Sequence, residues 1–222
     1  MQVTNLAYFY ETSRKVRGGK WVWVKDSNGE ARNNVLLGGT ILNPNKGFGH
    51  LWAAQLVQYT PAEGCLIFRS FELADDANGT SITIKGDGYS DAPEVGMLLM
   101  AAPDNVTVTG QSAAVTNVVY DKTNEVFNVT LSVALGELTE GTILVEAAGT
   151  VAAADATVLV PNPNTFIEAD RDLMPTEGYG IENANYSIST VYNKQAWIKR
   201  MQPLPTYVLA KNRSYIEGIF WI

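Results

Sequence analysis

The central part of the chain alternates apolar and polar residues with the period of two that is typical of half-buried β-strands. The clearest cases are residues 80–85 (TSITIK) and residues 128–133 (NVTLSV). In the second, Val129, Leu131 and Val133 are predicted to face a core while their neighbours face water. Strands are predicted over residues 65–73, 80–85, 96–101, 105–109, 113–120, 125–133 and 141–147, separated by Gly, Pro, Asn and Asp turn residues.

The N-terminal part shows a more mixed pattern. Residues 20–25 (KWVWVK) predict a strand that enters a hairpin at Asn28-Gly29, because Asn-Gly favours the positive φ angles of a type I′ turn. An apolar stretch over residues 35–42, interrupted by two glycines, predicts a second strand. Apolar residues recur at helical spacing over residues 51–59, so a helix is expected there, closed by Pro61 and Gly64.

Composition divides the chain into four predicted segments. Residues 147–156 are small and low in complexity, and residues 160–164 (VPNPN) are typical of a stiff spacer. We therefore expect an N-terminal segment (1–64), a β domain (65–150), a linker (151–164) and a C-terminal arm (165–222) with one short helix over 193–201. The predicted fold class is mainly β, a small antiparallel sandwich or barrel with extended terminal segments and one or two short helices.

Charge and aromatic residues are distributed unevenly over these segments. Residues 66–160 contain 3 Lys/Arg against 13 Asp/Glu, whereas residues 1–50 contain 7 basic and 3 acidic side chains. All five tryptophans and 17 of the 22 aromatic residues lie outside the acidic stretch. An acidic surface limits non-specific association, and exposed tryptophan is enriched in interfaces. This contrast predicts a solvated middle and flanks that contact a partner.

Several function classes are disfavoured by composition. A single cysteine (Cys65) and a single histidine (His50) leave little material for a disulfide, a zinc site or a catalytic triad. No metal and no cofactor are expected. The start lacks the features of a signal peptide, and no run of about 18 apolar residues is present. We expect synthesis in a reducing cytoplasm, no membrane partner and, because the net charge is −7, no nucleic acid partner.

The enzyme hypothesis rests on paired carboxylates. Asp75 and Asp76, or Asp170 and Asp172, would suit glycoside hydrolysis if their carboxyl groups were held roughly 5 to 10 Å apart. The neighbouring Asn78-Gly79 favours a solvated turn for the first pair, and an exposed salt-bridged turn explains the second. His50 is expected to make a structural hydrogen bond, and Cys65 to be a buried small hydrophobic residue.

Three stretches carry a family resemblance. Residues 68–74 (FRSFELA), 93–103 (PEVGMLLMAAP) and 138–147 (LTEGTILVEA) resemble head-associated structural proteins of tailed bacteriophages that infect gut Bacteroidetes, the crAss-like phages. The resemblance covers roughly residues 65–150. It implies a capsid decoration or head-fibre protein without catalytic residues, located on the capsid exterior.

The sequence thus predicts a non-enzymatic virion protein that docks on the major capsid protein or another head protein, with self-association also open. The alternative is a carbohydrate-binding or adhesion module. The expected partner-contacting residues lie in the flanks: Trp21, Trp23, Trp197, Tyr215, Phe220, Trp221 and Ile222.

Overall fold

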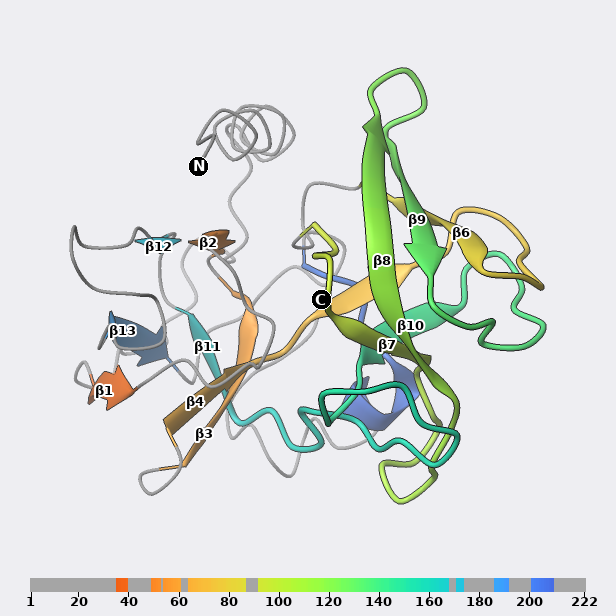
Figure 1. Ribbon diagram of the computed structural model, residues 1–222. Coiled ribbons are helices and arrows are strands. Elements are labelled where there is room, and N and C mark those ends of the chain that lie inside the picture. Colours follow the sequence, from red (N-terminus) through yellow and green to blue (C-terminus); the bar gives the residue numbers. More distant parts are fainter. Residues whose placement is uncertain are drawn as a thin grey trace.

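Figure 1 shows a computed structural model of the chain, which describes residues 35–39, 49–52, 54–60, 64–86, 92–167, 171–173, 186–191 and 201–209. These residues form mainly antiparallel β-strands, with one helical turn over residues 206–209. The predicted fold class is therefore confirmed.

The most regular unit is a six-stranded antiparallel sheet in the order β5-β10-β7-β8-β9-β6. A bridge between Leu73 and Ile84 joins its two edges, since Leu73 directly follows β5 and Ile84 lies in β6. The Ala74 N–H also donates to the Thr83 carbonyl at 2.8 Å. The sheet thus closes into a barrel, which leaves no edge at this position. Its strands are β5 (Ser70–Glu72), β6 (Ser81–Lys85), β7 (Leu98–Ala101), β8 (Ser112–Asp121), β9 (Val126–Leu131) and β10 (Ile143–Glu146).

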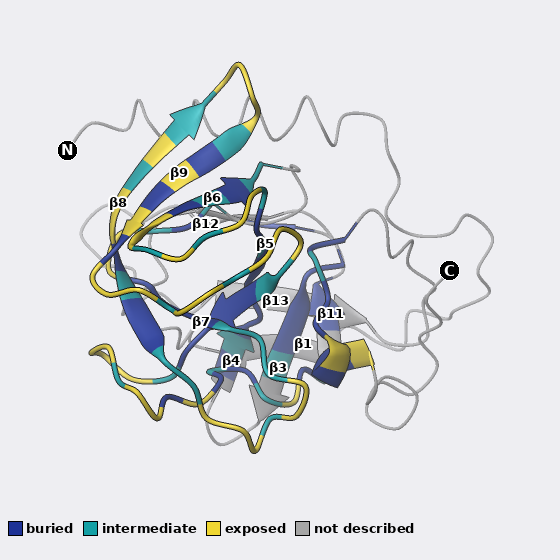
Figure 2. Ribbon diagram, turned by 90° about the vertical axis from the view of Figure 1, so that its right-hand side faces the viewer, coloured by how far each residue is buried: buried dark blue, intermediate teal, exposed yellow. Residues whose placement is uncertain are grey.

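Period-two alternation decides which side chains fill the barrel. In β6, Ile82 and Ile84 are buried and their neighbours are exposed or half-buried. In β9, Phe127, Val129 and Leu131 are buried while Asn128 and Thr130 face water, as the sequence pattern predicts. The β8–β9 hairpin rises above the rest of the barrel (Figure 1). Its alternating buried and exposed positions are visible in Figure 2.

A second sheet lies beside the barrel and has the order β1-β13-β11-β3-β4. Its strands are β1 (Val35–Gly39), β3 (Leu56–Thr60), β4 (Gly64–Ile67), β11 (Thr165–Ile167) and β13 (Tyr186–Val191). A separate pair joins β2 (Gly49–Leu51) to β12 (Arg171–Leu173). The chain passes from β4 in the second sheet to β5 in the barrel through Phe68 and Arg69. The single strand predicted over residues 65–73 is therefore two strands in two sheets.

Two hydrophobic cores follow from this arrangement. The barrel core lies inside the closed sheet, and the second core lies between the barrel and the five-stranded sheet. Strand β7 serves both, because Leu99 points into the barrel core while Leu98 and Met100 point into the second core. All three side chains are fully buried, and each contributes about 1.5–3 kcal/mol of hydrophobic stabilisation.

Residues from the predicted linker and the predicted C-terminal arm complete the second core. Ala156, Val158 and Val160 are buried there, although the sequence predicts a linker over 151–164. Backbone contacts tie it to the barrel, since Ala156 exchanges two hydrogen bonds with Gly110 and Ala147 is bridged to Val158. Residues 201–209, here called the strap, add Met201, Leu204, Tyr207 and Val208.

The helix predicted over residues 51–59 is wrong. Leu51 ends β2, Ala54 takes a left-handed φ of 64°, and β3 begins at Leu56. The side chain of Gln55 closes the turn by accepting a hydrogen bond from the Trp52 N–H at 3.2 Å. Most described positions of this segment are apolar and buried on both sides. Their spacing therefore matches a helix although none forms.

The strand predicted over residues 105–109 is also wrong. The Asn105 side chain accepts a hydrogen bond from the Thr107 N–H, and its carbonyl accepts one from Val108, which makes a turn. Val133 lies beyond the end of β9 and is 39% exposed, so it does not join Val129 and Leu131 in the core. Strand β1 covers the first part of the predicted strand 35–42. The predicted hairpin over 20–29 lies outside the described residues, as does the predicted helix over 193–201 except for its last residue.

Candidate functional site

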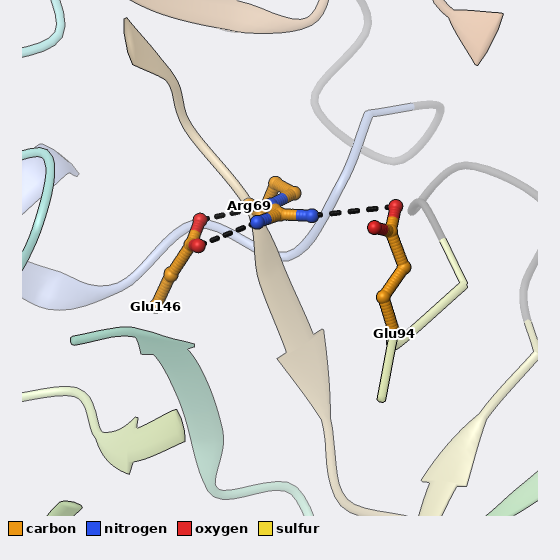
Figure 3. Close-up of polar contacts among 3 residues, drawn as sticks. All are labelled: Arg69, Glu94 and Glu146. Carbon is orange, nitrogen blue, oxygen red and sulfur yellow. Dashed lines mark hydrogen bonds and ion pairs between the residues drawn. The ribbon is translucent and has the colours of Figure 1, made fainter. Parts of the chain in front are cut away.

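A buried ion pair joins the barrel to the crossing between the two sheets. Arg69 donates from Nε to Glu146 Oε2 at 2.8 Å and from Nη2 to Glu146 Oε1 at 2.5 Å (Figure 3). Its Nη1 lies 3.4 Å from Glu94 Oε1. The Arg69 side chain is fully buried and that of Glu146 is 2% exposed, whereas Glu94 is 24% exposed. One cation thus holds two carboxylates from distant parts of the sequence, here called the Arg69 cluster.

Backbone pairing positions the members of this cluster. Glu146 ends β10 and Arg69 precedes β5, and these two strands pair in the barrel. Glu94 lies before the turn that enters β7. The strap also contacts this crossing, since Gln202 Nε2 donates to the Phe68 carbonyl at 3.0 Å and Ser70 Oγ to the Pro203 carbonyl at 2.5 Å.

The Arg69 cluster is suited to a structural role. A bidentate guanidinium and carboxylate pair is geometrically specific, and burial makes it costly to break. The sequence reasoning missed this cluster, although Arg69 stands as a single cation inside an apolar run (CLIFRSF). A charged residue within a predicted buried strand is the signal that points to a buried partner.

The exposed surface of the barrel unit is strongly acidic. Among the side chains that the structure describes, seven exposed carboxylates stand against one exposed cation, Lys122. The exposed carboxylates are Asp75, Asp76, Asp104, Glu125, Glu137, Glu140 and Asp155. Lys85 is half-buried and pairs with Glu72 at 2.5 Å. This uneven exposure gives the barrel a negative field that repels other acidic surfaces.

The hairpin loop between β8 and β9 is closed by one of the remaining carboxylates. Asp121 accepts hydrogen bonds from the backbone N–H groups of Thr123 and Asn124 and from the Asn124 side chain. The Asn124 side-chain bond, followed by the two backbone bonds, lowers the pKa of Asp121 below its ordinary value. The carboxylate is therefore committed to the turn.

The carboxylates considered as catalytic candidates are not brought together into a site within the described residues. Asp75 and Asp76 are exposed in the turn after β5, and Asp76 Oδ1 accepts a hydrogen bond from the Glu140 N–H at 2.7 Å. Asp172 is the backbone partner of His50 in the β2 and β12 pair, a proximity that sequence reasoning did not predict. The side chains of those two residues, and the whole of Asp170, lie outside the described part.

Cys65 is fully buried, and burial raises the pKa of its thiol to about 12. This agrees with its interpretation as a small hydrophobic residue. Within the described residues, no group of three or more His, Cys, Asp or Glu side chains is arranged to hold a metal ion. No helix in the described part of the chain is long and apolar enough to cross a membrane.

The predicted partner-contacting residues lie outside the described residues: Trp21, Trp23, Trp197, Tyr215, Phe220, Trp221 and Ile222. Every aromatic side chain that is described is buried or half-buried, and Tyr120 packs on Phe127 with ring centroids 4.9 Å apart. No protein-family model, no curated protein and no solved structure matches this chain.

Proposed function

We propose that this chain is a non-enzymatic virion structural protein that attaches to a bacteriophage head through its aromatic terminal segments and exposes an acidic barrel. The partner is the major capsid protein or another head protein. The observation that carries the proposal is the contrast between the acidic barrel surface, which has no exposed aromatic ring among its described side chains, and the tryptophan-bearing flanks.

The fold supports attachment at one end. Strands β1 and β13 pair so that Val35 lies opposite Thr190 and Gly39 opposite Tyr186. Residues 1–34, with Trp21 and Trp23, therefore join the body beside the chain that continues towards Trp197. This junction lies in the five-stranded sheet, away from the projecting β8–β9 hairpin (Figure 1). Two of the aromatic segments thus leave the body at one junction, which suits a protein that decorates a shell, whereas Tyr215 to Ile222 follow the strap in the second core.

Many copies on a symmetric shell would make even weak attachment effective, because avidity multiplies the contribution of each contact. Tryptophan supplies large contact area and is enriched among residues that dominate binding energy. The negative barrel would then face solvent and keep neighbouring particles apart. The carbohydrate-binding alternative needs exposed rings on one face of the barrel, and no described side chain favours it.

The proposal is tested by cosedimentation with phage heads that lack this protein. The full chain is compared with a Trp21→Ala, Trp23→Ala, Trp221→Ala variant and with an Asp75→Asn, Asp76→Asn control that alters only the exposed barrel surface. We expect saturable binding by the full chain and the control, and a loss of at least tenfold in affinity for the tryptophan variant. Equal binding by all three, or binding by none, would contradict attachment through the flanks.

A further inference from the structure

Asn78 and Gly79 stand apart from the other asparagine positions of the described chain. The Asn78 side chain is exposed, and neither it nor the Gly79 N–H takes part in a hydrogen bond. A Cβ built on Gly79 would meet nothing within 4 Å, so the space around this peptide is open. The exposed side-chain amide of Asn78 and the following backbone nitrogen are thus both free of hydrogen bonds, and residue 79 has no side chain to shield that nitrogen.

Other asparagines lack this combination. Asn105 Oδ1 accepts a hydrogen bond from the Thr107 N–H, and Asn124 Nδ2 donates to Asp121. Asn128 is exposed, but it is paired within the sheet, opposite Thr83 and Val119, and it is followed by the β-branched Val129 rather than by glycine. A reaction that needs a free amide side chain and an unshielded neighbouring nitrogen is therefore favoured at Asn78.

We propose that Asn78 is a site of spontaneous deamidation through a cyclic imide. The Gly79 nitrogen gives its proton to water or hydroxide and forms a bond to Asn78 Cγ, and the bond from Cγ to Nδ2 breaks as ammonia leaves. Water then opens the ring at either carbonyl, which yields aspartate or isoaspartate. The sum is asparagine plus water giving the acid plus ammonia, so no other reactant is needed.

The surroundings hold the product in a defined place. Ala77 exchanges two backbone hydrogen bonds with Leu138, both 2.8 Å, and the Thr80 carbonyl accepts one from the Leu131 N–H at 2.7 Å. Asp75, Asp76, Glu137 and Glu140 lie exposed on the two turns that this pairing joins. Each event adds one negative charge to this acidic corner. Isoaspartate also lengthens the backbone by one carbon between two anchored residues.

The test is peptide mapping of the folded chain after incubation in mildly alkaline buffer below its unfolding temperature. Trypsin releases Ser70 to Lys85 as one peptide, since Arg69 and Lys85 precede its two cleavage points. We expect this peptide to convert progressively into two slightly heavier acid forms, one of them a substrate for isoaspartyl methyltransferase. The tryptic peptide with Asn128 is the internal reference and should convert at least tenfold more slowly.

Two variants make the result specific. Asn78→Gln should show no conversion, and Gly79→Ala, for which the structure leaves room, should slow it at least several-fold. A synthetic peptide of the same sequence reports the intrinsic rate. If the synthetic peptide converts while residue 78 of the folded chain remains an amide, or if Gly79→Ala converts as fast as the parent, the proposal is overturned.

Discussion

Arg69 and Glu146 are bound through two parallel hydrogen bonds of 2.8 and 2.5 Å in the interior of the protein, although 76 residues lie between them. Both side chains are almost completely removed from water. The pair ties the crossing between the two sheets to the last residue of β10. The contribution of this pair to stability can therefore be measured by replacing one partner.

Replacement of one partner is expected to be strongly destabilising. Arg69→Met leaves the Glu146 carboxylate buried without its bidentate partner, and we expect a loss of about 3–5 kcal/mol in the free energy of unfolding. Urea unfolding followed by circular dichroism measures it. The matched control is Lys85→Ala, which removes a half-exposed pair with Glu72 and should cost about 0–1 kcal/mol.

The double variant Arg69→Met, Glu146→Leu separates burial of an unpaired charge from loss of packing. Because it removes both charges, we expect it to be more stable than Arg69→Met alone. A double variant that is less stable than the single one would show that the pair itself, rather than the orphaned carboxylate, carries the stability.

The strap is expected to stabilise the barrel although it comes from the far end of the sequence. Tyr207 is 2% exposed within the second core, and its hydroxyl donates to the Val160 carbonyl at 3.4 Å. Tyr207→Ala should cost about 3–5 kcal/mol, as truncation of a buried aromatic side chain does. The exposed neighbour Thr206 provides the control, because Thr206→Ala should change stability by about 0.5 kcal/mol or less.

Tyr207→Phe refines this test because it removes only the hydroxyl and its hydrogen bond, worth about 1 kcal/mol. Chemical denaturation of the three variants gives the order Thr206→Ala, Tyr207→Phe, Tyr207→Ala in increasing loss. If Tyr207→Ala unfolds at the same urea concentration as the parent, the strap does not stabilise the second core.

Because the Cys65 thiol is buried, we expect the protein to lose stability at alkaline pH. Its thiol is neutral in the folded chain up to a pKa of about 12, whereas in the unfolded chain it ionises near the ordinary value of 9.0. The unfolded state therefore binds fewer protons between these values, and stability decreases there as pH rises. The stability contributed by the buried neutral thiol is fully present below about pH 9. Above that pH, the free energy of unfolding falls by up to about 1.4 kcal/mol per pH unit.

The comparison with Cys65→Ala isolates this titration from those of lysine and tyrosine. The free energy of unfolding of the parent should fall more steeply across the alkaline window than that of the variant. The native thiol should also resist iodoacetamide near neutral pH until the protein unfolds. Rapid alkylation of the folded chain would show that Cys65 is not buried as described.

Gly79 and Gly86, which lie before and after β6, differ in the space available for a side chain. A Cβ on Gly86 would lie 2.6 Å from the carbonyl oxygen of Glu125, a backbone atom that already accepts a hydrogen bond from the Gly86 N–H at 2.8 Å. Gly86→Ala should therefore cost about 1–3 kcal/mol. Gly79→Ala meets no atom within 4 Å and should change stability by less than about 1 kcal/mol. Thermal unfolding of both variants checks the order, and an equal response would remove the steric explanation.

Sequence pattern predicted β6 and β9 well because these strands are buried on one side and solvated on the other. Ser81–Lys85 and Val126–Leu131 show this alternation directly. The pattern failed over residues 51–59. Leu51, Trp52, Ala54, Leu56 and Val57 are all buried, so their spacing did not distinguish a helix from strands.

Long-range partners were also beyond the sequence pattern. The break at Phe68 and Arg69 divides one apolar run between two sheets, and the residues that contact it, Glu146 and Gln202 of the strap, lie far along the chain. The small residues near Ala156 suggested a linker, and nothing in their composition indicated that Ala156, Val158 and Val160 are buried in the second core. The Arg69 cluster was signalled by one charge in an apolar run, but its partners, 25 and 77 positions away, were not.

We propose that this protein attaches to a phage head with its barrel directed outwards. Cryo-electron microscopy of heads with and without the protein tests it most directly. We predict difference density on the outer capsid surface into which the barrel fits, with the five-stranded sheet nearer the shell and the β8–β9 hairpin facing solvent. Absence of density on the head, or a barrel turned towards the shell, would contradict the account.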